Sequence, residues 1–382
     1  MDFALSEEDA MIAETAQRMA RERLAPLAET LDRGEGRDAF LGNLKRLAEH
    51  GFMGLNVRAD YGGSEAGTTA FALSIEAFAR ACASTAVTAS VTNMVGEIIQ
   101  AVGSEEQRRR YLPPLCDGTY AAGAFCLTEA GAGSDPAGMT TRAAMDGNEW
   151  VLNGAKLYIT SAPYAGVFVV WAVTDPDAPK GKGISCFLVE AGTPGLVIGK
   201  AEKKLGQAGS ATCEVAFEDC RLPADALMGR QNDGFRIAVS ELAGGRIGIA
   251  GLALGIARAA MDAAIAYARE RRQFDRTIAD MQGIQWMIAD RETELEAARL
   301  LILQAAWLKD QGRPFARAAS MAKLYASEAA QRATYTALQI HGGAGYLTDH
   351  PVERHARDAR ITTIYEGTSE IQRLIIARDI LA

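Results

Sequence analysis

A carboxylate in a glycine-containing turn lies near the end of the 382-residue chain. Glu366 and Gly367 come directly before a stretch with helix-start signals. Ser369 and Gln372 predict a capping box, followed by the start of a buried stripe at Ile371, Leu374 and Ile375. Backbone N–H groups of the turn and the positive helix end would face the same side as Glu366. A base beside such donors suits proton abstraction next to a carbonyl, whereas the alternative is a solvated glutamate at a helix start.

Composition excludes several classes of protein. The chain is 48% hydrophobic and 23% charged, which is typical of a globular protein of two or three domains. The net charge of −8 and pI near 5.3 argue against nucleic acid or an anionic membrane as the main partner. No apolar run approaches the roughly 18 residues of a membrane span, so we expect no membrane insertion. The acidic N-terminus resembles neither a signal nor a transit peptide, and we expect a cytoplasmic protein.

The cysteines and histidines do not predict a metal site. The six cysteines include no C-x-x-C pair and read as reduced, buried thiols: Cys82, Cys116, Cys126, Cys186, Cys213 and Cys220. His350 and His355 are five residues apart, which is not the spacing of two ligands on one helical face. We therefore expect no bound metal.

The hydrophobic pattern changes character twice along the chain. We expect a helical domain over 1–122, with helices opening at Ser6, running from Phe71 through Ala89, and running from Glu105 to Leu112. We expect a mainly antiparallel β domain, a barrel or sandwich, over 123–225. Its strands are predicted at 150–152, 156–159, 167–173, 184–190, 196–200 and 211–220, with Asn153-Gly154 as a hairpin turn.

Helices return over 226–382. We expect them at about 244–271, 282–311 and 316–342, and the Ser369 helix would complete a four-helix bundle. Small residues crowd these helices and would let them pack closely. The fold class is therefore multidomain with both α and β structure.

A glycine-rich loop offers a second place for chemistry. Residues 125–135 end a strand and continue as Thr128-Glu129-Ala130-Gly131-Ala132-Gly133-Ser134-Asp135. Its glycines allow close approach to a flat polar ligand, and Thr128 and Ser134 add donors. The loop matches neither a Walker loop nor a dinucleotide fingerprint, so a plain surface loop is the alternative.

Together these motifs closely resemble, in order and over essentially the whole chain, the acyl-CoA dehydrogenases. That resemblance implies an α–β–α architecture, FAD as cofactor and α,β-dehydrogenation of an acyl-CoA. The N–H of Glu366 and a flavin ribityl hydroxyl would hold the thioester carbonyl. Glu366 would take the α-proton, and flavin N5 would accept the β-hydride. Gly245 stands where some relatives carry their base, which leaves Glu366 as the base here.

The resemblance also implies the binding residues. Tyr158 replaces the commoner Trp, and Ala243 replaces a frequent Asp, which puts one CoA contact in doubt. Substrate contacts are expected from Ser134, Ala243, Arg246 and Gly367. Cofactor contacts are expected from Phe125, Leu127, Thr128, Gly133, Ser134, Tyr158, Ile159, Thr160, Arg271, Phe274, Gln282, Gln339, Gly342, Gly343, Thr368 and Glu370.

The segment from Arg271 to Gln282 would reach the FAD pyrophosphate of a neighbouring subunit, because the guanidinium fork suits a diphosphate. A solvated basic helix end is the alternative. We therefore expect a homo-oligomer, a tetramer or at least a dimer, that passes electrons to an electron-transfer flavoprotein. Short- to medium-chain acyl-CoAs are the expected substrates. Two rival functions stay open: an acyl-CoA oxidase or flavin monooxygenase of the same fold, and a non-catalytic acyl-CoA-binding protein.

Overall fold

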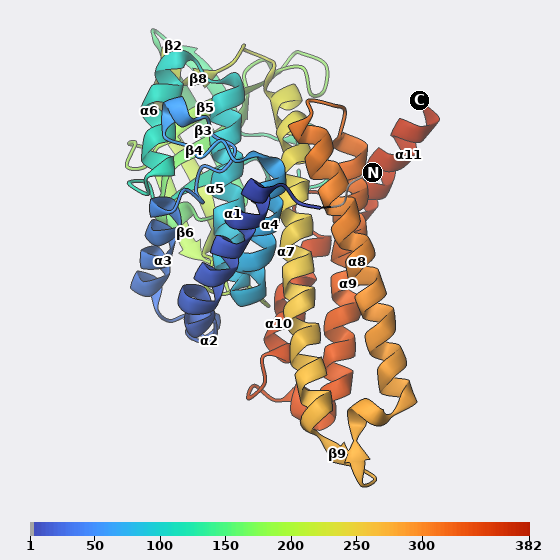
Figure 1. Cartoon of the computed structure of the whole chain (residues 1–382). Helices are drawn as coiled ribbons and strands as arrows, with labels where there is room; N and C mark the ends of the chain where they lie inside the picture. Colours follow the sequence, from blue (N-terminus) through green and yellow to red (C-terminus); the bar gives the residue numbers. More distant parts are fainter. Residues whose placement is uncertain (1–3) are drawn as a thin grey trace.

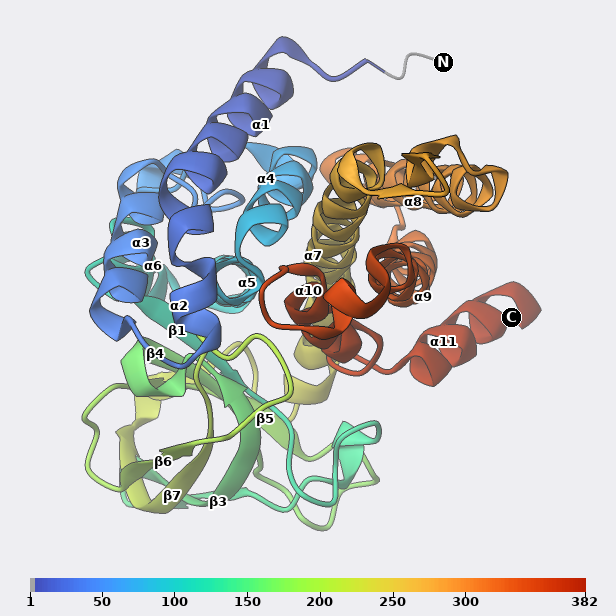
Figure 2. The same ribbon diagram turned by 90° about the horizontal axis from the view of Figure 1, so that it is seen from below.

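The computed structural model describes residues 4–382 and has a helical part, a β part and a second helical part (Figure 1). The first helical part and the β part lie together on one side, and the long helices of the third part stand beside them (Figures 1 and 2). The predicted fold class is confirmed, with six helices, eight strands of one sheet and five helices in chain order within the described residues.

The N-terminal part begins at α1 (Glu7–Met19), whose N-cap Ser6 accepts a hydrogen bond from the Asp9 N–H, as predicted. The single helix expected from Phe71 through Ala89 is two helices, because Cys82 adopts an extended backbone between them. The Glu105 helix continues through both prolines to Cys116 instead of ending before them. The remaining elements are α2 (Ala28–Asp32), α3 (Arg37–Glu49), α4 (Gly67–Ala81), α5 (Ala83–Val102) and α6 (Glu105–Cys116).

The middle part is one eight-stranded, mainly antiparallel sheet, as predicted. Its order is β6-β7-β3-β2-β4-β5-β8, and β1 pairs with β4 in parallel. On β7 the side chains of Cys213, Val215 and Phe217 are buried on one face. The strands are β1 (Ala122–Cys126), β2 (Arg142–Asp146), β3 (Glu149–Thr160), β4 (Ala165–Val173), β5 (Ile184–Glu190), β6 (Leu196–Ala201), β7 (Thr212–Pro223) and β8 (Leu227–Met228).

The hairpin predicted at Asn153-Gly154 is wrong. Strand β3 runs straight through these residues, and its pairing with β7 shifts register between Leu152 and Gly154. Gly154 has φ +145°, and a Cβ there would lie 2.6 Å from the Thr141 hydroxyl. The glycine therefore serves a bulge against a neighbouring segment rather than a turn.

The C-terminal part is built on α7 (Gly234–Glu270), which starts ten residues before the predicted position. Helices α8 (Gln282–Asp310) and α9 (Ala316–His341) match their predicted bounds to within one residue. Sequence reasoning missed α10 (Val352–Arg360). Helix α11 (Ser369–Leu381) packs against α9 near its start, and its C-terminal end extends away from the other helices (Figure 1). By length and composition α7 could cross a membrane, but 72% of its most apolar window is buried inside the protein.

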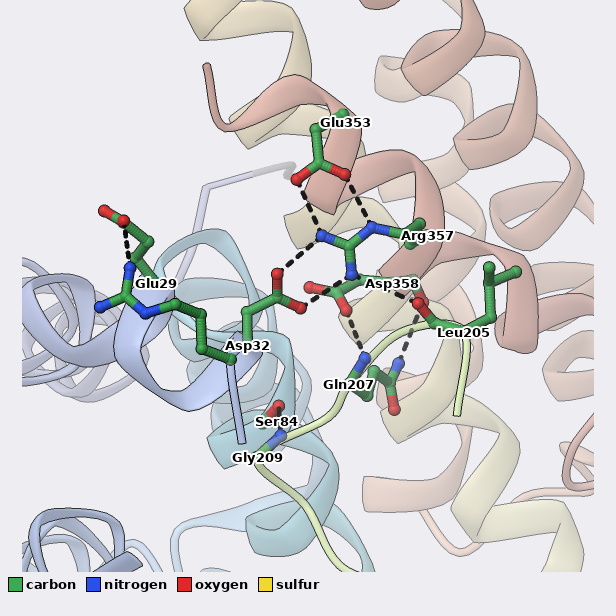
Figure 3. A network of polar contacts seen from close by, with 10 residues as sticks. Glu29, Asp32, Ser84, Leu205, Gln207, Gly209, Glu353, Arg357 and Asp358 are labelled. Carbon is green, nitrogen blue, oxygen red and sulfur yellow. Dashed lines mark hydrogen bonds and ion pairs between the residues drawn. The ribbon is translucent and has the colours of Figure 1, made fainter. Parts of the chain in front are cut away.

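A polar network joins all three parts of the molecule (Figure 3). Arg357 of α10 donates to both carboxylate oxygens of Asp32 in α2, at 2.8 and 2.6 Å, and also binds Glu353. Asp358 accepts from the backbone N–H of Gln207, in the loop before β7. The Gln207 amide also donates to the hydroxyl of Tyr365, the residue before Glu366, at 3.3 Å.

Candidate active site

The Glu366 turn has a backbone that few residues adopt. Glu366 has φ +51° and Gly367 has φ +93°, so two left-handed residues in succession reverse the chain before α11. The predicted capping box is wrong. Thr368 is the N-cap and accepts from the Ile371 N–H, whereas Ser369 is the first helical residue and donates to Glu328.

The Gln372 side chain holds the turn instead of completing a capping box. Its amide donates to the carbonyls of Glu366 at 3.2 Å and Gly367 at 2.8 Å. The buried stripe expected in α11 is also wrong for the single chain. Leu374 is exposed, Ile371 and Ile375 are partly exposed, and the buried side chains of α11 are Ser369 and Gln372.

The Glu366 carboxyl lies directly against α7. Its Oε2 atom is buried and has no hydrogen-bond partner. A Cβ built on Gly245 would overlap that oxygen and lie 2.7 Å from the Met94 sulfur and 3.1 Å from Glu366 Cδ. Position 245 must therefore lack a side chain for Glu366 to occupy this place.

Two buried cations approach the same carboxyl. Arg246, on α7, is 5% exposed, and its Nη1 lies 3.5 Å from the Ser320 hydroxyl while its Nε has no partner. Lys323, on α9, is fully buried and donates to the Gly367 carbonyl at 2.8 Å. Burial raises the pKa of Glu366 to about 7, although both cations act to lower it. A carboxyl with a pKa near neutrality and a free buried oxygen is suited to act as a general base.

The glycine-rich loop after β1 is fixed by a second buried carboxylate. Glu129 accepts from Lys156 Nζ at 2.7 Å and from the backbone N–H groups of Thr140 and Thr141 at 2.6 and 3.0 Å. Burial opposes the ionisation of Glu129, but Lys156 and these donors outweigh it and lower its pKa to about 2. The ion pair thereby ties the loop to strand β3.

Some of the predicted cofactor residues of this loop are held by hydrogen bonds, and others are exposed to solvent. Leu127 is buried, and its carbonyl accepts from Lys156, whereas Ser134 is exposed. Thr128 is partly buried, and its carbonyl accepts from Leu157 of β3. A Cβ on Gly133 would have nothing within 4 Å. The loop is therefore rigid at its root and accessible at its glycines, which fits a flat polar ligand.

The end of β3 lies beside this loop. Tyr158 is 68% exposed and has φ +60°, whereas Ile159 is buried and Thr160 is partly buried. An exposed aromatic ring held in a strained backbone is a feature of ligand sites.

Strand β1 connects this region to α7. The ring centroid of Phe125 lies 4.4 Å from that of Trp171, whose indole donates to the Gly234 carbonyl at the start of α7. The β part thus contacts α7 slightly more than three turns before Arg246.

The remaining predicted cofactor residues form a separate group at the far end of the long helices. Arg271 ends α7, and Phe274, 87% exposed with φ +50°, lies in the short β9–β10 hairpin (Arg272–Gln273 and Arg276–Thr277) below the helices in Figure 1. The other members of this group are exposed too: Gln282, Gln339, Gly342 and Gly343. Within one chain they do not join the Glu366 turn.

The two predicted cofactor residues after Glu366 lie on its outer side. Thr368 and Glu370 line a groove of about 370 Å³ together with Ile364 and Arg360. Of the predicted substrate residues, Ala243 and Arg246 are buried on α7, and Gly367 lies in the turn itself.

Several residues of the site escaped sequence reasoning. Lys323 lies among buried alanines of α9, so a lysine within an apolar stripe was an available signal. Lys156 and Gln207 gave none, because their partners are 27 and 151 residues away. Over residues 4–382, no cluster of His, Cys, Asp and Glu could hold a metal, and all six cysteines are free and buried.

Family models match almost the whole chain. The acyl-CoA dehydrogenase N-terminal domain matches residues 6–119, the middle domain 124–220 and the C-terminal domain 232–381. The chain belongs to the acyl-CoA dehydrogenase family. It is similar to acryloyl-CoA reductase (NADH) of Anaerotignum propionicum, at 46% identity over 100% of this chain and 96% of the relative. It is also 46% identical to the human mitochondrial short-chain specific acyl-CoA dehydrogenase, over 99% of this chain and 91% of the relative.

Solved structures of family members agree with this fold over their full length. Butyryl-CoA dehydrogenase of Megasphaera elsdenii is 38% identical with a TM-score of 0.96, covering 100% of both chains. A chain of the structure described as the electron transferring flavoprotein of Acidaminococcus fermentans is 42% identical with a TM-score of 0.97, also over 100% of both. PigA with FAD and proline is 31% identical with a TM-score of 0.94, over 100% of this chain and 99% of PigA.

Proposed function

We propose that this acyl-CoA dehydrogenase introduces a double bond between Cα and Cβ of a short- to medium-chain acyl-CoA, with Glu366 as the base. The observation that carries the proposal is the Glu366 carboxyl: Oε2 is buried, unpartnered and placed over the bare backbone of Gly245. A base must be free of competing hydrogen bonds to accept a proton, and this oxygen is.

The surrounding residues define what the turn does. Glu366 takes the α-proton, while its own N–H and the N-terminus of α11 stabilise the negative charge that develops on the thioester oxygen. Arg246 and Lys323 favour the ionised carboxyl and so oppose the effect of burial. Gly245 leaves space for the carboxyl and keeps α7 from contacting it with a side chain.

FAD fits the residues of the β part. The open glycines of the loop, the partly buried Thr128 and the exposed Tyr158 ring together offer a platform for an isoalloxazine, with Thr160 at its edge. FAD is present in the PigA structure, a family member of the same fold. When bound, the flavin supplies the acceptor for the β-hydride. Arg271, Phe274, Gln282, Gln339, Gly342 and Gly343 would serve the FAD of a second copy, in a homotetramer.

The packing behind Gly245 favours a short acyl group. One turn further along α7, a Cβ on Gly248 would lie 2.5 Å from the Ser90 hydroxyl and 2.8 Å from the Phe71 ring. Side chains therefore fill the space on this face of α7 one helical turn beyond Gly245. Relatives named for short-chain and butyryl substrates support the same choice.

An electron-transfer flavoprotein is the proposed electron acceptor, supported by the Acidaminococcus fermentans structure. We propose that the transfer takes place in the cytoplasm.

The test is anaerobic bleaching of the bound flavin by a panel of acyl-CoAs. Butyryl-CoA or isobutyryl-CoA should reduce wild-type flavin with a higher kcat/KM than palmitoyl-CoA. Glu366→Gln keeps the size of the side chain but cannot take the proton, so reduction should fall by a factor on the order of 10² to 10⁴ or more. Glu370→Gln is the matched control and should retain most of the rate when saturated with FAD. Rapid reoxidation of the reduced enzyme by O₂ would instead support an oxidase.

A further inference from the structure

Two side chains hydrogen-bond the same carbonyl directly after the base. The Gly367 oxygen accepts from Lys323 Nζ and from Gln372 Nε2, each at 2.8 Å. A carbonyl oxygen has two lone pairs, so these donors satisfy it fully. The neutral amide of Gln372 already meets the need for one donor. What Lys323 adds beyond a hydrogen bond is a positive charge.

That charge lies in a costly place. The Lys323 side chain is fully buried, and among the described residues its ammonium forms no ion pair within 4.0 Å. Burying an ammonium without a paired carboxylate is unfavourable by several kcal/mol. Burial accordingly lowers the pKa of Lys323 to about 8, with Glu366 acting in the opposite sense. An apolar residue would fit the alanine-rich face of α9 at lower cost, which points to a role other than stability.

We propose that Lys323 is a positioning residue that holds the Glu366–Gly367 turn through the Gly367 carbonyl and, by its charge, favours the ionised form of the Glu366 carboxylate. The proposal rests on the proposed role of Glu366 as the base. Lys323 does not touch the carboxyl or the substrate. It acts through its hydrogen bond to the Gly367 carbonyl and through the electrostatic effect of its positive charge on the carboxylate.

Other charged groups also act on Lys323 and Glu366. Arg246, on α7, also favours the ionised form of Glu366, and its positive charge lowers the pKa of Lys323. Glu328, on α9 itself, and Glu370, on α11, both act on Lys323, but they bind Ser369 and Arg373 respectively. Lys323 and Arg246 are therefore the two cations that act on Glu366, and Lys323 alone also bonds its turn.

The experiment compares the wild-type holoenzyme with three variants in the rate of anaerobic flavin reduction by saturating butyryl-CoA between pH 5.5 and 9.5. Lys323→Met removes the charge and keeps an unbranched side chain, and Lys323→Gln is the second neutral variant should the first fold poorly. Gln372→Met removes the other donor to the Gly367 carbonyl, together with the bond to the Glu366 carbonyl, and leaves the charge in place.

Without the charge of Lys323, the pH at which the rate of flavin reduction is half its maximum should rise by at least about one pH unit. Lys323→Met should therefore be about tenfold or more slower than wild type at pH 6 and should approach wild type by pH 9. Gln372→Met should lose rate by a similar factor at every pH, with the midpoint unchanged. Thermal unfolding at pH 7 should show Lys323→Met at least as stable as wild type, because it removes a buried charge.

An unchanged midpoint in both neutral variants, or a loss that is equal at all pH values, would overturn the charge role of Lys323. The two proposals fail separately. If Glu366→Gln stays active, the base assignment is wrong, whereas an inactive Glu366→Gln together with an unshifted Lys323→Met refutes the role of Lys323 alone.

Discussion

Glu129 and Glu366 are both carboxylates in turns of the candidate site, yet their surroundings are opposite. Glu129 has a lysine at 2.7 Å and two backbone donors, and its pKa lies near 2. Glu366 has a buried oxygen without any partner, and its pKa lies near 7. The first arrangement fixes a loop in place. The second leaves a carboxyl able to gain and lose a proton, and the comparison shows how one residue type serves structure or chemistry according to its partners.

Breaking the ion pair between Lys156 and Glu129 should have the largest effect on stability. Lys156→Met leaves Glu129 buried without its cation and should lower the free energy of unfolding by about 3 kcal/mol or more. Chemical denaturation of the holoenzyme measures this loss. Glu366→Gln is the matched control, because Oε2 of Glu366 has no hydrogen-bond partner to lose, and it should cost clearly less. Equal losses in the two variants would show that the two carboxylates are not held differently.

Gly245→Ala tests whether the space over α7 places the base. The added Cβ would overlap Glu366 Oε2, and the flexible carboxyl and Met94 would have to move. A displacement of about 1 Å should cost about 100-fold in kcat with the fold intact. Gly283→Ala, in α8 with nothing within 4 Å of its Cβ, makes the same change in open space and should leave kcat unaltered. Full activity in Gly245→Ala would remove the steric argument for this glycine.

The pH dependence separates the two carboxylates further. Because Glu366 must be ionised, the rate of flavin reduction should fall about tenfold per pH unit below pH 7. Its raised pKa means that the folded state binds a proton that the unfolded state has released between about pH 4.5 and 7. The free energy of unfolding of wild type, relative to that of Glu366→Gln, should therefore decrease as pH rises from about 4.5 to 7. If the difference between the two free energies of unfolding stayed constant from pH 5 to 8, the raised pKa would be contradicted.

The smallest expected effect concerns the N-cap of α11, directly after the Glu366 turn. Thr368 caps α11, so Thr368→Ala should cost about 1 kcal/mol of local stability. Hydrogen exchange at the Ile371 amide measures it. Ser369→Ala should leave that amide protected, because Ser369 donates to Glu328 instead. The opposite order of protection would restore Ser369 as the cap.

Regular periodicity predicted most of the fold. Strand β5 follows from an apolar run, and helix α8 follows from a long stretch that ends at Gly312 and Pro314; the observed bounds of both agree closely. Where the sequence misled, a distant contact decided the local structure. Asn153-Gly154 has the composition of a hairpin turn, but pairing with β7 and the approach of Thr141 keep it within a strand. The break at Cys82 carries neither glycine nor proline and gave no local signal.

The site was predictable to the extent that its residues are adjacent in sequence. Glu366 and Gly245 were found from their motifs, and the structure brings them into contact although they are 121 positions apart in the sequence. Lys323 was not assigned to the turn, and Gln372 was assigned to a capping box, because the function of each depends on which carbonyl it reaches. Local sequence gives the identity of a reactive group, and tertiary contacts set its charge state.

The most direct test of Glu366 as the base is deuterium exchange at Cα of butyryl-CoA in D₂O, using enzyme whose flavin has been reduced beforehand so that oxidation cannot proceed. Mass spectrometry of the recovered thioester reports proton abstraction alone. Wild type should incorporate deuterium at Cα, and Glu366→Gln should do so at least about 100-fold more slowly, with Glu370→Gln close to wild type. Exchange in Glu366→Gln within tenfold of the wild-type rate would show that another group removes the proton.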